Sequence, residues 1–247
     1  METPAQRLLG MILPGGWKVI RPVEKRPGSS GGFFSCGYVV ESETGQLGFL
    51  KALDYSAAMA EVDPARALQV ITEMFNFERD LVRVCTNKNL DRVVRGLSDG
   101  AVRVDGQPVQ YLIFELADGD ARSQADESHR YERAWSLRAL HHVATGIAQL
   151  HRESIAHQDL KPSNVLSFDG GKVSKVGDLG RASHRGDYPP HEDVPIAGDV
   201  SYAPPERLYG YQDPDWSRRR LGCDAYLFRN HGDFLHDGRW NDTSTAC

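Results

Sequence analysis

The sequence has few cysteines, and they are not arranged to bind a metal or to build a disulfide framework. The 247-residue chain contains four, Cys36, Cys85, Cys223 and Cys247, all far apart. Structural zinc sites need clustered ligands such as a Cys-x-x-Cys pair, and disulfide scaffolds need many cysteines in a short chain. Both classes are excluded. Isolated thiols are typical of a reducing compartment, so we expect a cytoplasmic protein.

The start of the chain lacks both a membrane-spanning run and the features of a signal peptide. Its apolar stretch covers only residues 8–13 and contains Gly10, whereas a spanning helix needs about 20 apolar residues. No basic cluster precedes the stretch, as it would in a secretory signal. We therefore predict a protein that does not enter a membrane.

Positive charge is not in excess either. Lys and Arg number 29 against 34 Asp and Glu, which gives a net charge of −5. Nucleic acids and anionic membranes are bound through basic surfaces, so neither is expected as a partner. The 40% content of hydrophobic residues is ordinary for a globular protein, and the length allows one domain or a two-lobed unit with its own core.

The chain changes from strands to helices along its length. Alternating apolar residues predict strands at 17–23, 33–41, 47–53, 102–104 and 109–115, with a hairpin turn at Thr44-Gly45. Helical spacing predicts helices at 64–85 and 131–152. We predict an α+β fold with an N-terminal extension at 1–16, a strand-rich lobe at 17–116 and a helical lobe from 117. Two lobes suggest a ligand cleft.

Residues 157–166 read HQDLKPSNVL and are the most informative segment. They resemble the catalytic loop of eukaryotic-type Ser/Thr protein kinases, in a bacterial-looking variant. The resemblance implies that Asp159 accepts the proton of the substrate hydroxyl and that Lys161 steadies the transferring phosphoryl group. It implies that Asn164 binds a magnesium ion.

Two later segments fit the same family. Gly177-Asp178-Leu179-Gly180 resembles its Asp-Phe-Gly motif, so Asp178 is implied to hold Mg²⁺ on the nucleotide phosphates. Residues 198–206 resemble the end of the activation segment, with Pro204-Pro205-Glu206 in place of Ala-Pro-Glu. Glu206 is then expected to pair with a distal arginine, a role in the fold rather than in the chemistry. Asp199 stands where a threonine is usual.

The strand-rich lobe supplies the nucleotide-binding residues that the resemblance implies. Lys51 would contact the ATP phosphates and pair with a helix carboxylate, for which we choose Glu78 over Glu73. The glycine-rich loop lacks a strict G-x-G-x-x-G pattern and could equally be a plain hairpin turn. Its phosphate-covering residues would be Gly31, Gly32, Phe33, Phe34 and Ser35. With Phe114 as gatekeeper, the backbone from Glu115 to Ala117 would face the adenine.

Two departures from the family bear on regulation. Gln158 replaces the arginine that usually precedes the catalytic aspartate and reads an activation-loop phosphate. Residues 178–206 contain no threonine, only Ser183, Ser201 and two tyrosines. We therefore expect no conventional switch by phosphorylation of this segment.

The resemblance covers residues 17–228. Residues 223–228 resemble the start of a helix that runs through the middle of the helical lobe, and the resemblance implies that Asp224 ties to the backbone of the catalytic loop. Residues 229–247 form an atypical tail in which Gly232 and Gly238 interrupt that expected apolar helix. The rest of a helical lobe does not follow, so its apolar faces would be exposed, which favours self-association. We expect a C-terminally truncated kinase domain with a tail read in a shifted frame. A short isoform completed by a partner is the competing hypothesis.

The predicted function is ATP- and Mg²⁺-dependent phosphoryl transfer to Ser/Thr hydroxyls of an unidentified protein substrate. One alternative is a catalytically impaired kinase-like module that binds a nucleotide or a partner. Another is a small-molecule kinase of the aminoglycoside-phosphotransferase type, which shares the Asp and Asn positions. Lys161 and the 204–206 motif favour protein substrates.

Overall fold

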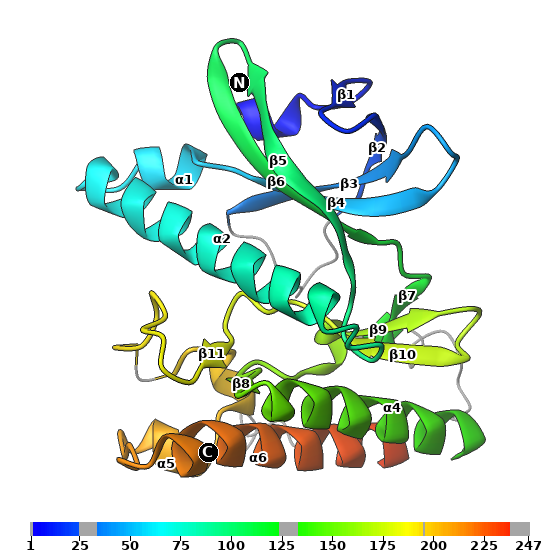
Figure 1. The fold of residues 1–247 in the computed structure, drawn as a ribbon. Helices are drawn as coiled ribbons and strands as arrows, with labels where there is room; N and C mark the ends of the chain where they lie inside the picture. Colours follow the sequence, from blue (N-terminus) through cyan, green and yellow to red (C-terminus); the bar gives the residue numbers. More distant parts are fainter. Residues whose placement is uncertain (1, 25–33, 124–132, 195, 238–247) are drawn as a thin grey trace. The chain divides into compact units, whose positions relative to one another are not determined.

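The computed structural model describes residues 2–24, 34–123, 133–194 and 196–237 (Figure 1). The chain divides into two compact units. The N-terminal unit comprises Met1–Thr86 and Arg95–Leu116, and the C-terminal unit comprises Asn87–Val94 and Ala117–Cys247. The first is rich in strands and the second in helices, which confirms the predicted α+β class.

The N-terminal unit is built on one antiparallel sheet with the strand order β1-β2-β3-β4-β6-β5. Its strands are β1 (Ile12–Leu13), β2 (Trp17–Pro22), β3 (Ser35–Glu41), β4 (Leu47–Leu53), β5 (Gly96–Val104) and β6 (Gln107–Glu115). The β3–β4 hairpin turns where the sequence predicted, and Gly45 there has a φ of +81°. Strand β5 starts well before the predicted residue 102, because Ser98, Asp99 and Gly100 pair with β6. The sequence did not indicate this part of the strand, since these three residues lack apolar alternation.

Residues before β2 pack into the core of this sheet. A 3-10 turn, η1 (Pro4–Gln6), leads into β1, and Ala5, Leu8 and Leu13 are buried in the same cluster as the sheet residues. The Tyr38 hydroxyl donates a 2.7 Å hydrogen bond to the Ala5 carbonyl. Burial raises the pKa of Tyr38 to about 12. The start of the chain therefore stabilises the sheet directly.

Two helices complete the N-terminal unit. A short α1 (Ser56–Met59) precedes α2 (Pro64–Asn87), whose first residue is proline, as suits a helix start. Ile71 and Phe75 of α2 pack with Leu53 of β4 and Leu112 of β6. This contact fixes α2 against the sheet and so determines which of its carboxylates can reach β4.

The C-terminal unit is organised around two long helices that pack on each other, α4 (Arg133–Arg152) and α6 (Trp216–Asp237) (Figure 1). Its short strands are β7 (Gly119–Asp120), β8 (Ile155–Ala156), β9 (Val165–Phe168), β10 (Val173–Val176) and β11 (Ser183–His184). They form the sheets β10-β9-β7 and β11-β8. The other short helices among the described residues are the 3-10 helices η2 (Pro162–Asn164) and η3 (Val200–Tyr202) and the α-helix α5 (Pro205–Leu208).

Helix α6 differs from the prediction at both ends. It begins at Trp216, before the predicted start near Cys223, and it continues through Gly232 to Asp237. An interior glycine costs a helix about 1 kcal/mol, which packing against α4 can offset. Gly238 and the rest of the tail lie outside the described residues. Within the described ranges, no helix is both long and apolar enough to cross a membrane.

Gly146 in α4 gives a first testable prediction. A Cβ at this position would lie 2.7 Å from the Arg92 carbonyl oxygen and 3.0 Å from Val176 Cγ2. Gly146→Ala should therefore destabilise the chain by about 1–3 kcal/mol despite the better helix propensity of alanine. The matched control is Gly222→Ala in α6, where nothing lies within 4 Å, and which should stabilise by up to about 1 kcal/mol. Urea unfolding measures both, and equal stabilisation would contradict the packing argument.

Candidate functional site

In the N-terminal unit, Lys51 of β4 forms a bidentate ion pair with Glu78 of α2. The Lys51 Nζ atom lies 2.7 Å from Glu78 Oε1 and 2.9 Å from Oε2. The Glu78 side chain is only 6% exposed, whereas that of Lys51 is 24% exposed. Glu73, the alternative carboxylate, instead accepts a hydrogen bond from Gln69 on the exposed face of the helix. The pair therefore fixes an ammonium group beside the sheet.

In the C-terminal unit, the loop between β8 and β9 gathers three residues that the sequence singled out. Asp159 Oδ2 accepts hydrogen bonds from Lys161 Nζ at 3.0 Å and Asn164 Nδ2 at 3.2 Å. Asp159 Oδ1 accepts one from the backbone amide of Asp199 at 2.8 Å. All three loop side chains are buried. The aspartate is thus held in one orientation by groups from two separate segments.

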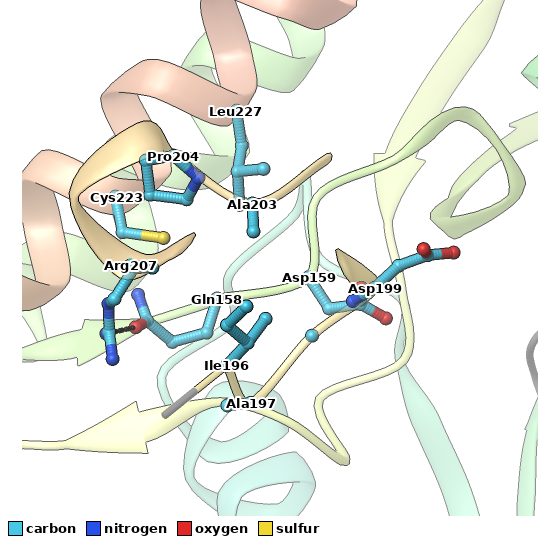
Figure 2. Close-up of a pocket in the computed structure, with 11 residues that line it drawn as sticks. Gln158, Asp159, Ile196, Ala197, Asp199, Ala203, Pro204, Arg207, Cys223 and Leu227 are labelled. Carbon is cyan, nitrogen blue, oxygen red and sulfur yellow. Dashed lines mark hydrogen bonds between the residues drawn. The ribbon is translucent and has the colours of Figure 1, made fainter. Parts of the chain in front are cut away.

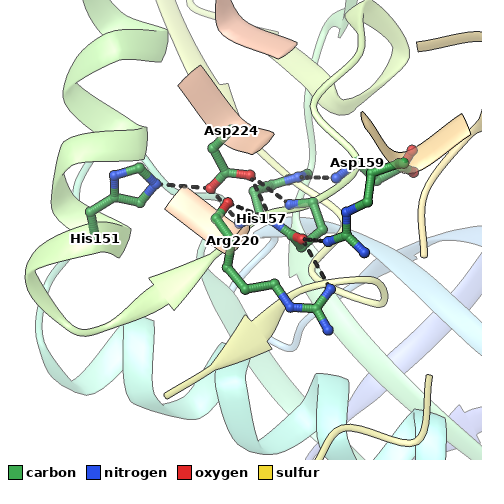
Figure 3. Close-up of polar contacts among 7 residues, drawn as sticks. His151, His157, Asp159, Arg220 and Asp224 are labelled. Atoms are coloured by element: carbon green, nitrogen blue, oxygen red, sulfur yellow. Dashed lines mark hydrogen bonds and ion pairs between the residues drawn. The ribbon is translucent and has the colours of Figure 1, made fainter. Parts of the chain in front are cut away.

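A buried carboxylate of α6 shapes this loop. Asp224 is fully buried and accepts backbone hydrogen bonds from His157 at 2.7 Å and Gln158 at 2.8 Å (Figure 3). The Nε2 atom of His151 lies 2.9 Å from the same carboxylate. Gln158 has a φ of +65°, a left-handed conformation that is costly for a residue with a side chain. Asp224 therefore holds the backbone next to Asp159 in a strained turn.

The segment around Asp178 is linked to the same loop. The ring of the buried His157 is 2.9 Å from the Gly177 carbonyl oxygen, and the Gly177 amide donates to the Asn164 carbonyl at 2.8 Å. Asp178 has a φ of +59°, and its carboxylate accepts a 3.4 Å hydrogen bond from Gly180. These contacts place the Asp178 backbone beside that of Asn164.

The electrostatics of the cluster favour a bound cation. Burial raises the pKa of Asp159, Lys161 opposes that rise, and the neighbouring charge of Asp178 adds to it. Asp199 Oδ2 also lies 3.6 Å from Lys161 Nζ. Two carboxylates therefore lie beside one ammonium group, and the charge of Asp178 adds to theirs, which leaves a surplus of negative charge.

The donor set fits magnesium rather than a metal held by protein alone. Within the described part of the chain, no group of three or more His, Cys, Asp or Glu could hold a metal ion. Mg²⁺ typically takes one or two protein carboxylates together with substrate phosphates. The Asn164 amide nitrogen already donates to Asp159, which leaves its Oδ1 as an acceptor. Asp178 and Asn164 can thus supply the protein oxygens.

The other predicted nucleotide-binding residues are only partly described. Gly31, Gly32 and Phe33 lie outside the described residues. Phe34 packs on the cluster between α2 and the sheet, and Ser35 begins β3. The Glu115 amide donates to the Arg95 carbonyl, and its carboxylate accepts from the Arg95 amide. Ala117 belongs to the C-terminal unit.

The predicted arginine partner of Glu206 is not present in the described part of the chain, where the Glu206 side chain is exposed and forms no ion pair. Glu192 pairs with Arg219 Nη2 at 2.9 Å and with Arg220. One signal in the sequence could have indicated this contact, the run Arg218-Arg219-Arg220 shortly before Asp224.

A small cavity lies beside Asp159, between the segment 196–204 and α6 (Figure 2). Its volume of about 10 Å³ is room for a single water molecule. Cys223 lines it, and burial raises the pKa of that thiol to about 12. The cavity is therefore not a nucleotide site, and its thiol stays protonated.

A family model described as Protein kinase domain matches residues 29–219. Among curated proteins, the chain is 29% identical over 106 residues to Aurora/IPL1-related protein kinase 2 of Caenorhabditis elegans, covering 42% of this chain and 33% of the relative. It is 30% identical over 135 residues to Serine/threonine-protein kinase DCLK1 of Rattus norvegicus, covering 50% and 30%. The chain thus matches about a third of the length of these relatives.

Proposed function

The chain belongs to the protein kinase domain family, and from this premise we propose that it transfers a phosphoryl group from ATP to Ser/Thr hydroxyls of protein substrates. The observation that carries the proposal is the buried cluster of Asp159, Lys161 and Asn164 with Asp178 beside it. Positioning and charge stabilisation account for most of the catalysis of phosphoryl transfer. The cluster offers both.

Asp159 is the residue proposed to orient the acceptor hydroxyl and accept its proton. Its Oδ1 receives one hydrogen bond, from Asp199, and a carboxylate oxygen can accept two. A hydroxyl can therefore share that oxygen without displacing the contacts that hold the side chain. Lys161, 3.0 Å from Oδ2, places a positive charge where the transferring group would develop negative charge.

The nucleotide side of the reaction is assigned to Lys51, Asp178 and Asn164. Glu78 restricts the Lys51 ammonium group to one position, so that it can contact the ATP phosphates. Mg²⁺, when bound by Asp178 and Asn164, supplies charge neutralisation on those phosphates. Serine and threonine are favoured as acceptors because relatives such as DCLK1 are named serine/threonine-protein kinases and because Lys161 follows Asp159 by two residues.

The proposal is tested with radiolabelled ATP, the purified chain, a generic Ser/Thr protein acceptor and a panel of small alcohols. We expect label on the protein acceptor only, and loss of that label with EDTA. Lys51→Met should lower the rate by about 10²-fold or more. The matched control is Lys88→Met, since Lys88 is an exposed lysine paired with Glu153, and it should retain full activity.

The other outcomes of this assay identify the alternatives. Label on alcohols alone would indicate a small-molecule kinase. Saturable binding of a fluorescent ATP analogue with no transfer to any acceptor would indicate a nucleotide-binding module. Equal rates for Lys51→Met and the unmodified chain would refute the assignment of Lys51.

A further inference from the structure

Glu192 lies in the segment between β11 and η3 and binds two arginines of α6. Its Oε1 accepts from Arg219 Nη2 at 2.9 Å, and its Oε2 accepts from Arg220 Nη2. The three side chains are largely shielded from water, with 18% exposure for Glu192, 19% for Arg219 and 1% for Arg220. Partly buried ion pairs are weakly screened by salt, so this contact can fix the segment on α6.

Arg220 depends on this carboxylate. Its side chain is one of the largest fully buried ones in the described part of the chain. Its Nε atom has no hydrogen-bond partner among the described residues. Burial lowers the pKa of Arg220, while the Glu192 charge opposes that shift. A buried cation without a counter-charge is strongly destabilising. Glu192 is the carboxylate that compensates it.

Arg220 also contacts the catalytic loop. Its Nη1 donates to Gln158 Oε1 at 3.2 Å, and Arg207 Nη2 donates to the same oxygen at 3.1 Å (Figures 2 and 3). The Gln158 amide nitrogen donates in return to the Arg220 carbonyl at 2.8 Å. A neutral acceptor suits this place, because an arginine at 158 would bring a third guanidinium against two others. Gln158 therefore accepts from both arginines without adding a further positive charge.

From this chain of contacts we propose that Glu192 is a positioning residue for phosphoryl transfer. Through Arg220 and Gln158 it holds the strained turn that precedes Asp159. The group that does so is a side-chain carboxylate rather than an added phosphate. We call Glu192, Arg220 and Gln158 the tether. The proposal rests on the proposed function and specifies its regulation: the site is held in its working form without phosphorylation of the segment.

The hydroxyls of the segment are consistent with a tether that needs no phosphate. Ser183 is fully buried in β11. Ser201 lies in η3, where its amide donates to the Asp199 side chain. Phosphatase treatment of the purified chain should accordingly leave its transfer rate unchanged. A rate that falls tenfold or more after that treatment would overturn the proposal.

The direct test compares Glu192→Gln with the control Asp193→Asn, which changes an exposed neighbouring carboxylate that accepts from the Tyr188 hydroxyl. Two readouts are taken: hydrogen exchange of residues 183–194 and steady-state transfer kinetics. Glu192→Gln should speed exchange at least about tenfold and lower kcat about 10²-fold with little change in the KM for ATP. Asp193→Asn should change neither. Unchanged exchange and kcat in Glu192→Gln would overturn the tether.

A second set of variants tests the tether even if the chain proves inactive. Gln158→Arg and Arg220→Gln should each lower the urea midpoint, the first by crowding three guanidiniums and the second by leaving Glu192 with Arg219 alone. The double variant moves the cation from α6 to the loop and should recover part of the loss. If the double variant recovers part of the urea midpoint while the unmodified chain shows no transfer activity, the tether is supported and the proposed function is rejected. Additive losses in a chain that is active would reject the tether alone.

Discussion

Asp159→Asn should reduce phosphoryl transfer by about 10²–10⁴-fold, the usual contribution of a positioned general base. The substitution preserves the shape of the side chain and keeps one acceptor for the Asp199 amide, but the amide cannot take the hydroxyl proton. A single-turnover measurement with saturating ATP isolates the chemical step. Binding of a fluorescent ATP analogue should be retained, because the assigned phosphate contacts come from other residues.

The control for this variant is Asp169→Asn. Asp169 lies in the exposed turn after β9 with a φ of +54°, a conformation that asparagine also tolerates. The rate of that variant should equal the rate of the unmodified chain. If Asp159→Asn also retained the full rate, the carboxylate would have no part in the chemistry and the function would have to be reassigned.

Asp224→Ala should lower the free energy of unfolding by about 3–5 kcal/mol, as expected when one partner of a buried charged network is removed. The change leaves the His157 and Gln158 amides buried without their acceptor, and each such orphaned group costs about 1–3 kcal/mol. Urea unfolding measures the loss. Because folded proteins are stable by only about 5–15 kcal/mol, the effect is a large share of the total.

Asp215→Ala provides the comparison within the same helix. Asp215 accepts from the Arg218 amide at the exposed start of α6, and loss of such a cap costs about 1 kcal/mol. Asp224→Asn keeps one acceptor oxygen, so its loss in the free energy of unfolding should lie between the losses of these two variants. A loss for Asp224→Ala no greater than that for Asp215→Ala would show that α6 does not hold the loop.

Local sequence signals predicted the elements that carry the candidate site. The alternation around Lys51 and the helical spacing around Glu78 were sufficient for β4 and α2, because both elements bury one regular face. The resemblance of residues 157–166 to the catalytic loop of protein kinases similarly pointed to Asp159, Lys161 and Asn164. These three lie within six residues, so short-range loop geometry is enough to bring them together.

Other features had no local signal. The first half of β5 is polar and forms a strand only because β6 pairs with it. Gly232 marks a helix end in isolation, yet α6 continues past it along α4. In both cases, tertiary contacts supply free energy that the local residues do not.

The amino-acid sequence by itself determined the family, the α+β class and the residues proposed for catalysis, because these depend on residue types at short and regular spacings. Only the tertiary structure decided that Glu192 is the partner of Arg220 and that Gln158 accepts from two arginines. Those pairs are separated by tens of residues. Their energy comes from shielding charges and backbone amides from water, and a side chain acquires that environment only when distant segments fold against it.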